Sequence, residues 1–292
     1  MSCWSCISWV SASVRRQRQG FAQQEQPLPE VSATDVARES ARLLQDTGTT
    51  KFYSSGSYGD AIDQYLKAQA TLRDANVADT FLEAQLLRNI GLCHMRQERY
   101  AEAIALFEQA SSLLKAAGEA TAARCAEQGA ELERYMGICH GHQGAYQAAL
   151  DLFTSTEAAL EAAGATRSAE YTLLLCDMGM CYYCTGRLPE AMAFFSKARA
   201  AFEASSATLT SGYAMMLFAT GACQYDEGNK AAAATLFSSA KVAFEESGMT
   251  GSHSHASLLQ ALGVCLREEG QSDEAERLLL ESQAMLDVDP SV

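Results

Sequence analysis

Ile90-Gly91-Leu92-Cys93 lies in the middle of an apolar run, and its Gly-x-Cys arrangement returns four more times in this chain of 292 residues. The later copies are Met136-Gly137-Ile138-Cys139, Met178-Gly179-Met180-Cys181, Thr220-Gly221-Ala222-Cys223 and Leu262-Gly263-Val264-Cys265. The positions of their glycines are evenly spaced, apart from a first step that is four residues longer than the three that follow. A nearly fixed period in this range is typical of an array in which one supersecondary unit is stacked many times.

Four further columns keep the phase of the glycines. An alanine lies twelve residues later, at Ala103, Ala149, Ala191, Ala233 and Ala275. A large apolar residue lies sixteen residues later, at Phe107, Phe153, Phe195, Phe237 and Leu279. A turn position lies seven residues later, at Glu98, Gly144, Gly186, Gly228 and Gly270. A helix-ending position lies eleven residues after Tyr65 and after the four phenylalanines of that column, at Asn76, Gly118, Gly164, Ser206 and Gly248. Because glycine and asparagine accept the left-handed backbone that ends a helix, each unit is predicted to hold two helices, A and B.

This pattern resembles the tetratricopeptide repeat, in which helices A and B lie antiparallel and a tight turn joins them. In that family the glycine and the alanine lie where the two helices cross, since backbones about 8–10 Å apart leave little room for side chains. The resemblance implies an all-α fold, a right-handed superhelical solenoid of about six helix-turn-helix units. The array is expected over residues 33–288, with units at about 33–76, 78–118, 119–164, 166–206, 207–248 and 252–288. The first unit is expected to lack the glycine and to keep Gly56, Ala61 and Tyr65.

The 42-residue period is longer than the usual period of about 34 residues by roughly one turn on each helix. That length is similar to the repeats of kinesin light chains. Those repeats look like Leu-Asn-Asn-Leu-Ala at the start of the motif, and only Asn89 fits that pattern here. We therefore transfer no cargo specificity from that family.

The sequence argues against nucleic-acid binding and against a segment that spans a membrane. The net charge is −14, and the segment that ends at Gln24 carries three arginines and no acid, so the remainder carries −17 (−14 minus +3). Such an acidic body argues against nucleic-acid binding, because contacts to phosphates supply most of that affinity. The sequence contains no apolar run of 18 or more residues, so we predict no integral membrane segment.

Residues 1–32 do not fit the array and are predicted to form an N-terminal tail that is disordered or serves in targeting. The segment contains Arg15, Arg16 and Arg18, is rich in serine, and lacks acids as far as Gln24. Arg-rich, acid-poor N-termini are typical of mitochondrial transit peptides. A third interpretation is a segment that touches a membrane through acylated Cys3 and Cys6. We expect a cytoplasmic protein, with a mitochondrial one as the alternative.

No motif for catalysis, metal binding or a cofactor stands out, so we predict that the chain is not an enzyme and needs no cofactor. The cysteine two residues after each glycine is expected to be a small buried apolar residue. Cys176, Cys181 and Cys184 leave a metal or redox sensor as a distant alternative. His253 and His255 lie at a helix start and are expected to be exposed.

In the tetratricopeptide family helix A lines the concave face, which implies a groove for a partner. The groove residues so predicted are Arg88, Asn89, Arg96, Arg134, Tyr135, His142, Met180, Tyr183, Met215, Phe218 and Tyr225. Arginines fill the early half, and methionine and aromatic residues, which are enriched at interfaces, fill the later half. We expect a protein or peptide partner with acidic residues beside the early half and apolar anchors in the later half. The alternative is that the late-half residues pack against one another in a tight superhelix.

The last helix is predicted to offer a second surface. Leu278, Leu280 and Met285 cannot all face inward, so we expect docking or self-association at the C-terminal end, with a slightly apolar cap as the alternative. Together these features favour a non-enzymatic adaptor that binds a partner segment in its concave groove. The alternative is a scaffold subunit of a large assembly, docking through its convex face and C-terminal end.

Overall fold

The computed structural model describes residues 32–116 and 122–288, and within these ranges the chain forms twelve α-helices and no strand. The A helices are α2 (Ala33–Ser55), α4 (Thr80–Arg96), α6 (Ala122–His142), α8 (Ala169–Cys184), α10 (Ser211–Asp226) and α12 (His253–Glu268). The B helices are α3 (Tyr58–Asp74), α5 (Tyr100–Ala116), α7 (Tyr146–Ala162), α9 (Leu188–Ala204), α11 (Lys230–Glu246) and α13 (Ser272–Val288). The tail predicted at 1–32 and the helix end predicted at Gly118 lie outside the described residues, apart from Ser32.

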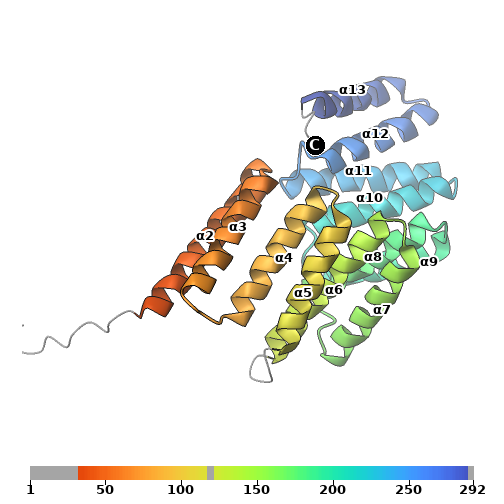
Figure 1. Cartoon of the computed structure of the whole chain (residues 1–292). Helices are drawn as coiled ribbons and strands as arrows, with labels where there is room; N and C mark the ends of the chain where they lie inside the picture. Colours follow the sequence, from red (N-terminus) through yellow and green to blue (C-terminus); the bar gives the residue numbers. More distant parts are fainter. Residues whose placement is uncertain (1–31, 117–121, 289–292) are drawn as a thin grey trace, which may run out of the picture.

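The helix pairs stack side by side along a curved array, from α2 to α13 (Figure 1). Each A helix packs along its own B helix, and each B helix packs against the next A helix. Successive A helices also contact each other, at α2–α4, α6–α8, α8–α10 and α10–α12. The A helices therefore lie on the inner side of the curve. This arrangement confirms an all-α solenoid of six helix-turn-helix units.

The turns and helix ends agree with the columns in the sequence. The turn after the A helix contains a residue with a positive φ in every unit, at Gly56, Glu98, Gly144, Gly186, Gly228 and Gly270. The end of the B helix has a positive φ at Asn76, Gly164, Ser206 and Gly248. Five A helices begin after a side chain that accepts a hydrogen bond from the first turn, namely Ser32, Asp79, Ser168, Thr210 and Ser252. These caps satisfy backbone N–H groups that have no partner inside the helix.

Each glycine of the repeated column faces an aromatic ring or leucine of its own B helix. A Cβ atom added at Gly91 would lie 2.5 Å from Cε1 of Phe107, and one at Gly179 would lie 2.6 Å from Cε1 of Phe195. In the last unit Leu279 takes the place of the ring against Gly263. These glycines are tolerated inside helices because the ring occupies the space that any side chain would need.

The first unit also has its glycine, so the expectation that it lacks one is wrong. A Cβ atom at Gly48 would lie 2.6 Å from Cε1 of Tyr65, the same environment as in the later units. Gly48 and Tyr65 are one position further apart than each later glycine and its partner, and the extra residue lies in helix A before Gly56. The hydroxyl groups of Tyr65 and Thr49 lie 3.3 Å apart, within hydrogen-bonding distance.

The core runs through the array as clusters shared between neighbouring units. The largest cluster extends from Leu175 in unit four to Leu278 in unit six. Phe107 illustrates the sharing, because its ring covers Gly91 of its own unit and stacks on Tyr135 of the next, with centroids 5.6 Å apart. Among the described residues, no helix is both long and apolar enough to cross a membrane.

Candidate functional site

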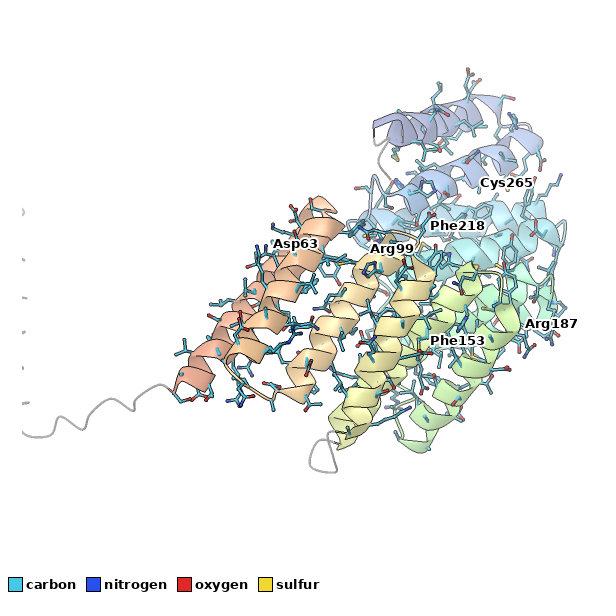
Figure 2. The ribbon with its side chains drawn as sticks, viewed as in Figure 1. Asp63, Arg99, Phe153, Arg187, Phe218 and Cys265 are labelled. Carbon is cyan, nitrogen blue, oxygen red and sulfur yellow. The ribbon has the colours of Figure 1, made fainter. Side chains whose placement is uncertain are left out.

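In the described part of the chain, three hollows follow one another along the A helices of the inner face. The first, of about 310 Å³, lies between units one and three and is lined largely by polar residues, among them Arg88, Asn89, Glu131 and Tyr135. The second, of about 540 Å³, lies between units three and five, and the third, of about 290 Å³, between units four and six. In Figure 2, Phe218 of the third hollow lies in the stretch of the array between Arg187 and Cys265. Nine of the eleven sequence-predicted groove residues are thus divided among these hollows, and Arg96 and Arg134 line none of the three.

Arg88 in the first hollow is already paired within the chain. Its Nη1 donates to Oε2 of Glu131 on the next A helix across 2.8 Å, and its Nε donates to Oδ1 of Asn89 across 3.3 Å. The hydroxyl of Tyr135 donates to the other oxygen of Glu131 across 3.0 Å. These contacts tie units two and three together on the inner side of the curve.

Arg134 is paired more completely. Only 7% of the residue is exposed, its Nη1 donates to Oδ2 of Asp177 across 2.8 Å, and its Nε donates to Glu170. Burial raises the pKa of both carboxyl groups, and the neighbouring Arg134 charge opposes that rise. Arg96 in turn donates from Nε to the hydroxyl of Tyr58 across 3.2 Å. The arginines of the early half therefore have partners within the chain, which the sequence analysis did not anticipate.

The two arginines that pair with carboxylates occupy the same place in their units, three residues before the glycine. Each reaches a carboxylate on the next A helix. The equivalent positions in units four, five and six hold Cys176, Phe218 and Gln260. The bridge between A helices therefore ends at unit four, and the inner face changes there from ionic to apolar.

The second hollow is the most apolar part of the inner face. Met180 of α8 and Met215 of α10 line it and remain 38% and 40% exposed. His142 lines the same hollow, and its ring stacks on Tyr100 at 5.1 Å. The other lining residues are Gly137, Ile138, Gly141, Tyr146, Phe153, Cys176, Asp177, Cys181, Cys184, Phe195, Met216 and Ala219. The alternative interpretation was that the late-half residues cover one another by packing together. Met180 and Met215 do not follow it, because both remain exposed.

The third hollow combines aromatic side chains with carboxylates. Burial, together with a hydrogen bond to Asp226, raises the pKa of Tyr183 to about 12. The Tyr225 hydroxyl donates to Oε1 of Glu268 across 3.2 Å. Phe218 packs against Phe237 with ring centroids 5.7 Å apart, which places it partly in the core. The aromatic residues of this hollow therefore have intramolecular partners.

Five of the seven described cysteines are buried. Burial raises the pKa of Cys93, Cys139 and Cys181 to about 12, so these thiols are protonated near neutral pH. Cys184 is the exposed member of the Cys176–Cys181–Cys184 group. Within the described ranges, no group of three or more His, Cys, Asp or Glu residues is placed to hold a metal ion.

The C-terminal end differs in part from the expectation. Leu278 is 2% exposed and Met285 packs against the core, so neither is free for docking. Leu280 is 64% exposed, and Leu286, which the sequence reasoning missed, is 38% exposed. The spacing of six residues from Leu280 to Leu286 does not follow one helix stripe, and for that reason the sequence pattern gave no signal for Leu286.

His255 is also placed differently from the expectation that it is exposed. It is 2% exposed, its Nδ1 accepts a hydrogen bond from the backbone of Gly251, and its ring lies 5.8 Å from that of Phe244. Burial lowers its pKa. Its Nε2 is buried without a hydrogen-bond partner, and nothing in its described surroundings indicates a catalytic use.

Comparisons with known proteins agree with this geometry. The tetratricopeptide repeat model matches residues 84–116, which covers most of α4 and all of α5. No curated protein matches the chain. Among solved structures, the Rap conjugation gene regulator of plasmid pLS20, in complex with the Phr* peptide, is 15% identical, with a TM-score of 0.69 over 99% of this chain and 75% of that one.

Two further structures share the fold. BtubC from P. vanneervenii is 10% identical, with a TM-score of 0.61 over 89% of this chain and 94% of that one. Kinesin-light-chain-like repeats of Podosopora anserina are 14% identical, with a TM-score of 0.52 over 74% of this chain and 100% of that one. At these identities the likeness concerns the fold. The family model thus matches one tetratricopeptide repeat, at residues 84–116, and the glycine contact of that repeat recurs in all six helix pairs of the array.

Proposed function

We propose that this chain is a non-enzymatic adaptor that holds a segment of a partner protein against its inner face, with the second hollow as the main anchor site. The observation that carries the proposal is the pair Met180 and Met215. They come from neighbouring A helices, line one apolar hollow of about 540 Å³, and keep more than a third of their surface exposed. The described part of the array thus leaves both methionines accessible to another chain.

Physical reasons favour a protein segment as the occupant. An exposed apolar depression is typical of an interaction site. Methionine side chains are unbranched and polarisable, so they adapt to apolar groups of different shape. The lining also includes exposed Cys184 and the polar groups Asp177 and His142, which could orient a bound backbone or side chain. An extended or helical segment with one or two large apolar residues fits this chemistry.

The sequence alone predicted a partner with acidic residues beside the early half, whereas the proposed partner does not depend on acidic residues. Arg88 and Arg134 are paired with three carboxylates, Glu131, Glu170 and Asp177, so the early half has no surplus positive charge from these groups. An acidic partner segment would have to displace these bridges. Apolar anchors in the later half therefore supply the recognition.

The structural comparisons support a peptide-binding use of this fold. The pLS20 Rap regulator was solved with the Phr* peptide, and another Rap protein with the competence and sporulation factor. The two matches cover 99% and 93% of this chain. Because the two proteins are only 15% and 13% identical to this chain, they support the class of function and give no residue roles.

The experiment is a comparison of co-purified proteins by mass spectrometry. The wild-type chain is compared with Met215→Glu, which places a charge in the hollow at a position that is already 40% exposed. Val242→Glu is the matched control, because Val242 is 51% exposed on the B helix of the same unit. Loss of a partner from Met215→Glu alone supports the proposal. Equal retention by both variants would contradict it.

A scaffold subunit that docks through its convex face and C-terminal end is the second candidate. The observation that favours it is Leu280, which is 64% exposed on α13, together with Leu286 near the end of the same helix. Terminal repeats of a solenoid usually present a polar outer face, since no further unit covers them. A partner retained by Met215→Glu and lost from Leu280→Glu would favour the scaffold.

A further inference from the structure

The inner face has a surplus of negative charge beside its apolar hollow. Two arginines, Arg88 and Arg134, meet three carboxylates there. Asp226 adds a further carboxylate at the third hollow, where it is exposed and accepts a hydrogen bond from Tyr183. A segment that complements this face combines large apolar residues with positive charge.

Such a segment exists in the same chain, before the array. Residues 1–14 contain no charged residue and include Trp4 and Trp9, which are both of the tryptophans of the protein. Arg15, Arg16 and Arg18 follow, in a chain whose residues beyond Gln24 carry −17. Apolar residues followed by three cations are the chemistry that the second hollow and its carboxylates would recognise.

The reach of the segment is sufficient. The chain enters the array at α2, which is an A helix and so lies on the inner side. Unit one is three units from unit four, so the path from α2 to α8 is about 30 Å at about 10 Å per step between packed helices. The roughly 24 residues from Trp9 to Ala33 can extend to as much as ~80 Å. The linker therefore spans the distance without being fully extended.

We propose that the N-terminal segment around Trp4–Arg18 binds the inner face of its own array, with a tryptophan in the hollow between Met180 and Met215 and the arginines beside the carboxylates. The segment then competes with the partner for one site, so that binding of the partner requires its release. Only the competition with a partner rests on the proposed function. The intramolecular contact can be tested without any partner.

The test uses tryptophan fluorescence of the full-length protein, because the signal comes only from Trp4 and Trp9. We expect the wild-type emission to be blue-shifted, and less quenched by acrylamide, relative to a synthetic peptide of residues 1–24. The double variant Met180→Gln/Met215→Gln should shift both values toward those of the peptide, because it makes the hollow polar without adding charge. The control Leu66→Gln/Val242→Gln changes two B-helix positions that are 49% and 51% exposed, and should leave both values unchanged.

A second variant tests the charges without altering the array. Arg15→Glu/Arg16→Glu/Arg18→Glu should also move the emission to the red, and circular dichroism should show unchanged helix content in all variants. Peptide-like emission in the wild type, or emission that ignores the Met180/Met215 substitution, would overturn the inference. A blue shift that disappears on dilution would overturn the intramolecular contact and show that the segment of one copy binds the array of another. A partner lost from Met215→Glu while the tryptophans stay water-exposed would overturn this inference and leave the proposed function standing.

Discussion

Nη1 of Arg134 donates a hydrogen bond to Oδ2 of Asp177 across 2.8 Å, and this contact joins the A helices of units three and four. The arginine side chain is 9% exposed and that of Asp177 is 27% exposed. Glu170, on the same helix as Asp177, accepts from Nε. The pairing is therefore largely shielded from solvent, and it fixes how closely the two inner helices approach beside the apolar hollow.

We expect Arg134→Gln to lower the free energy of unfolding by about 3 kcal/mol near pH 8, the lower end of the range for breaking a buried ion pair. Burial raises the pKa of Asp177 and of Glu170, and Arg134 opposes the rise. Without the arginine both pKa values rise further. In the folded variant these two carboxyl groups then stay protonated to a higher pH than in the unfolded chain. The free energy of unfolding of the variant therefore falls as the pH rises through their raised pKa values.

The cost of Arg134→Gln should accordingly be smaller near pH 5 than near pH 8, which urea unfolding at both values measures. Arg99→Gln serves as the control, because Arg99 pairs with Glu102 at the surface, with both side chains about half exposed. It should change stability little at either pH. A cost for Arg134→Gln that does not depend on pH would contradict the assignment of Asp177 and Glu170 as the groups left unpaired.

The glycine contact predicts opposite effects of one substitution at two places in α6. A Cβ atom at Gly137 would collide with the Phe153 ring, whereas one at Gly129 would meet nothing within 4 Å. Gly137→Ala should destabilise by about 1–2 kcal/mol, because overpacking outweighs the gain in helix propensity. Gly129→Ala should stabilise by up to about 1 kcal/mol. Urea midpoints of the two variants measure the difference, and equal signs would show that the ring does not set the spacing.

The periodic part of the fold was predictable from sequence because each feature depends on residues within one unit. The glycine, its Phe or Leu partner sixteen residues later and the turn at seven residues lie close along the chain. Gly48 was missed because one extra residue in helix A of unit one breaks the sixteen-residue spacing to Tyr65. Unit one therefore keeps the contact between glycine and ring, although it does not keep the sixteen-residue spacing.

The site was less predictable, because its character depends on contacts between units. Arg88 and Arg134 look like free cations when only the helix A positions are considered, yet each finds its carboxylate 43 residues later, on the next helix A. That separation is close to the repeat period itself. An arginine three residues before the glycine of one unit, followed by an acid near the glycine of the next helix A, is a signal that an alignment of the repeats could have shown.

The burial of the thiols predicts an order of alkylation. With iodoacetamide under native conditions, Cys184 should react before the buried cysteines Cys139 and Cys181, whose pKa values are raised to about 12 by burial. Only the thiolate is nucleophilic, so protonated and inaccessible thiols react slowly. Peptide mapping by mass spectrometry reports each site, and urea should remove the order. Rapid native labelling of Cys139 would indicate that the units open more readily than this packing implies.

The outer face of α13 predicts self-association through the last unit. Leu280 is 64% exposed on the last described helix, so a second copy is expected to cover it about a two-fold axis. Leu280→Glu should lower the association measured by sedimentation velocity over a range of concentrations, with helix content unchanged. Leu278→Glu is the contrasting variant, because Leu278 is 2% exposed and a buried charge there should unfold unit six. A charge at exposed Leu280 should not disturb the core, so a change in association can be assigned to the surface of α13. A wild-type chain that stays monomeric at every concentration would contradict self-association and identify α13 as a cap. Met180 and Met215 would then be the remaining candidates for contact with a partner.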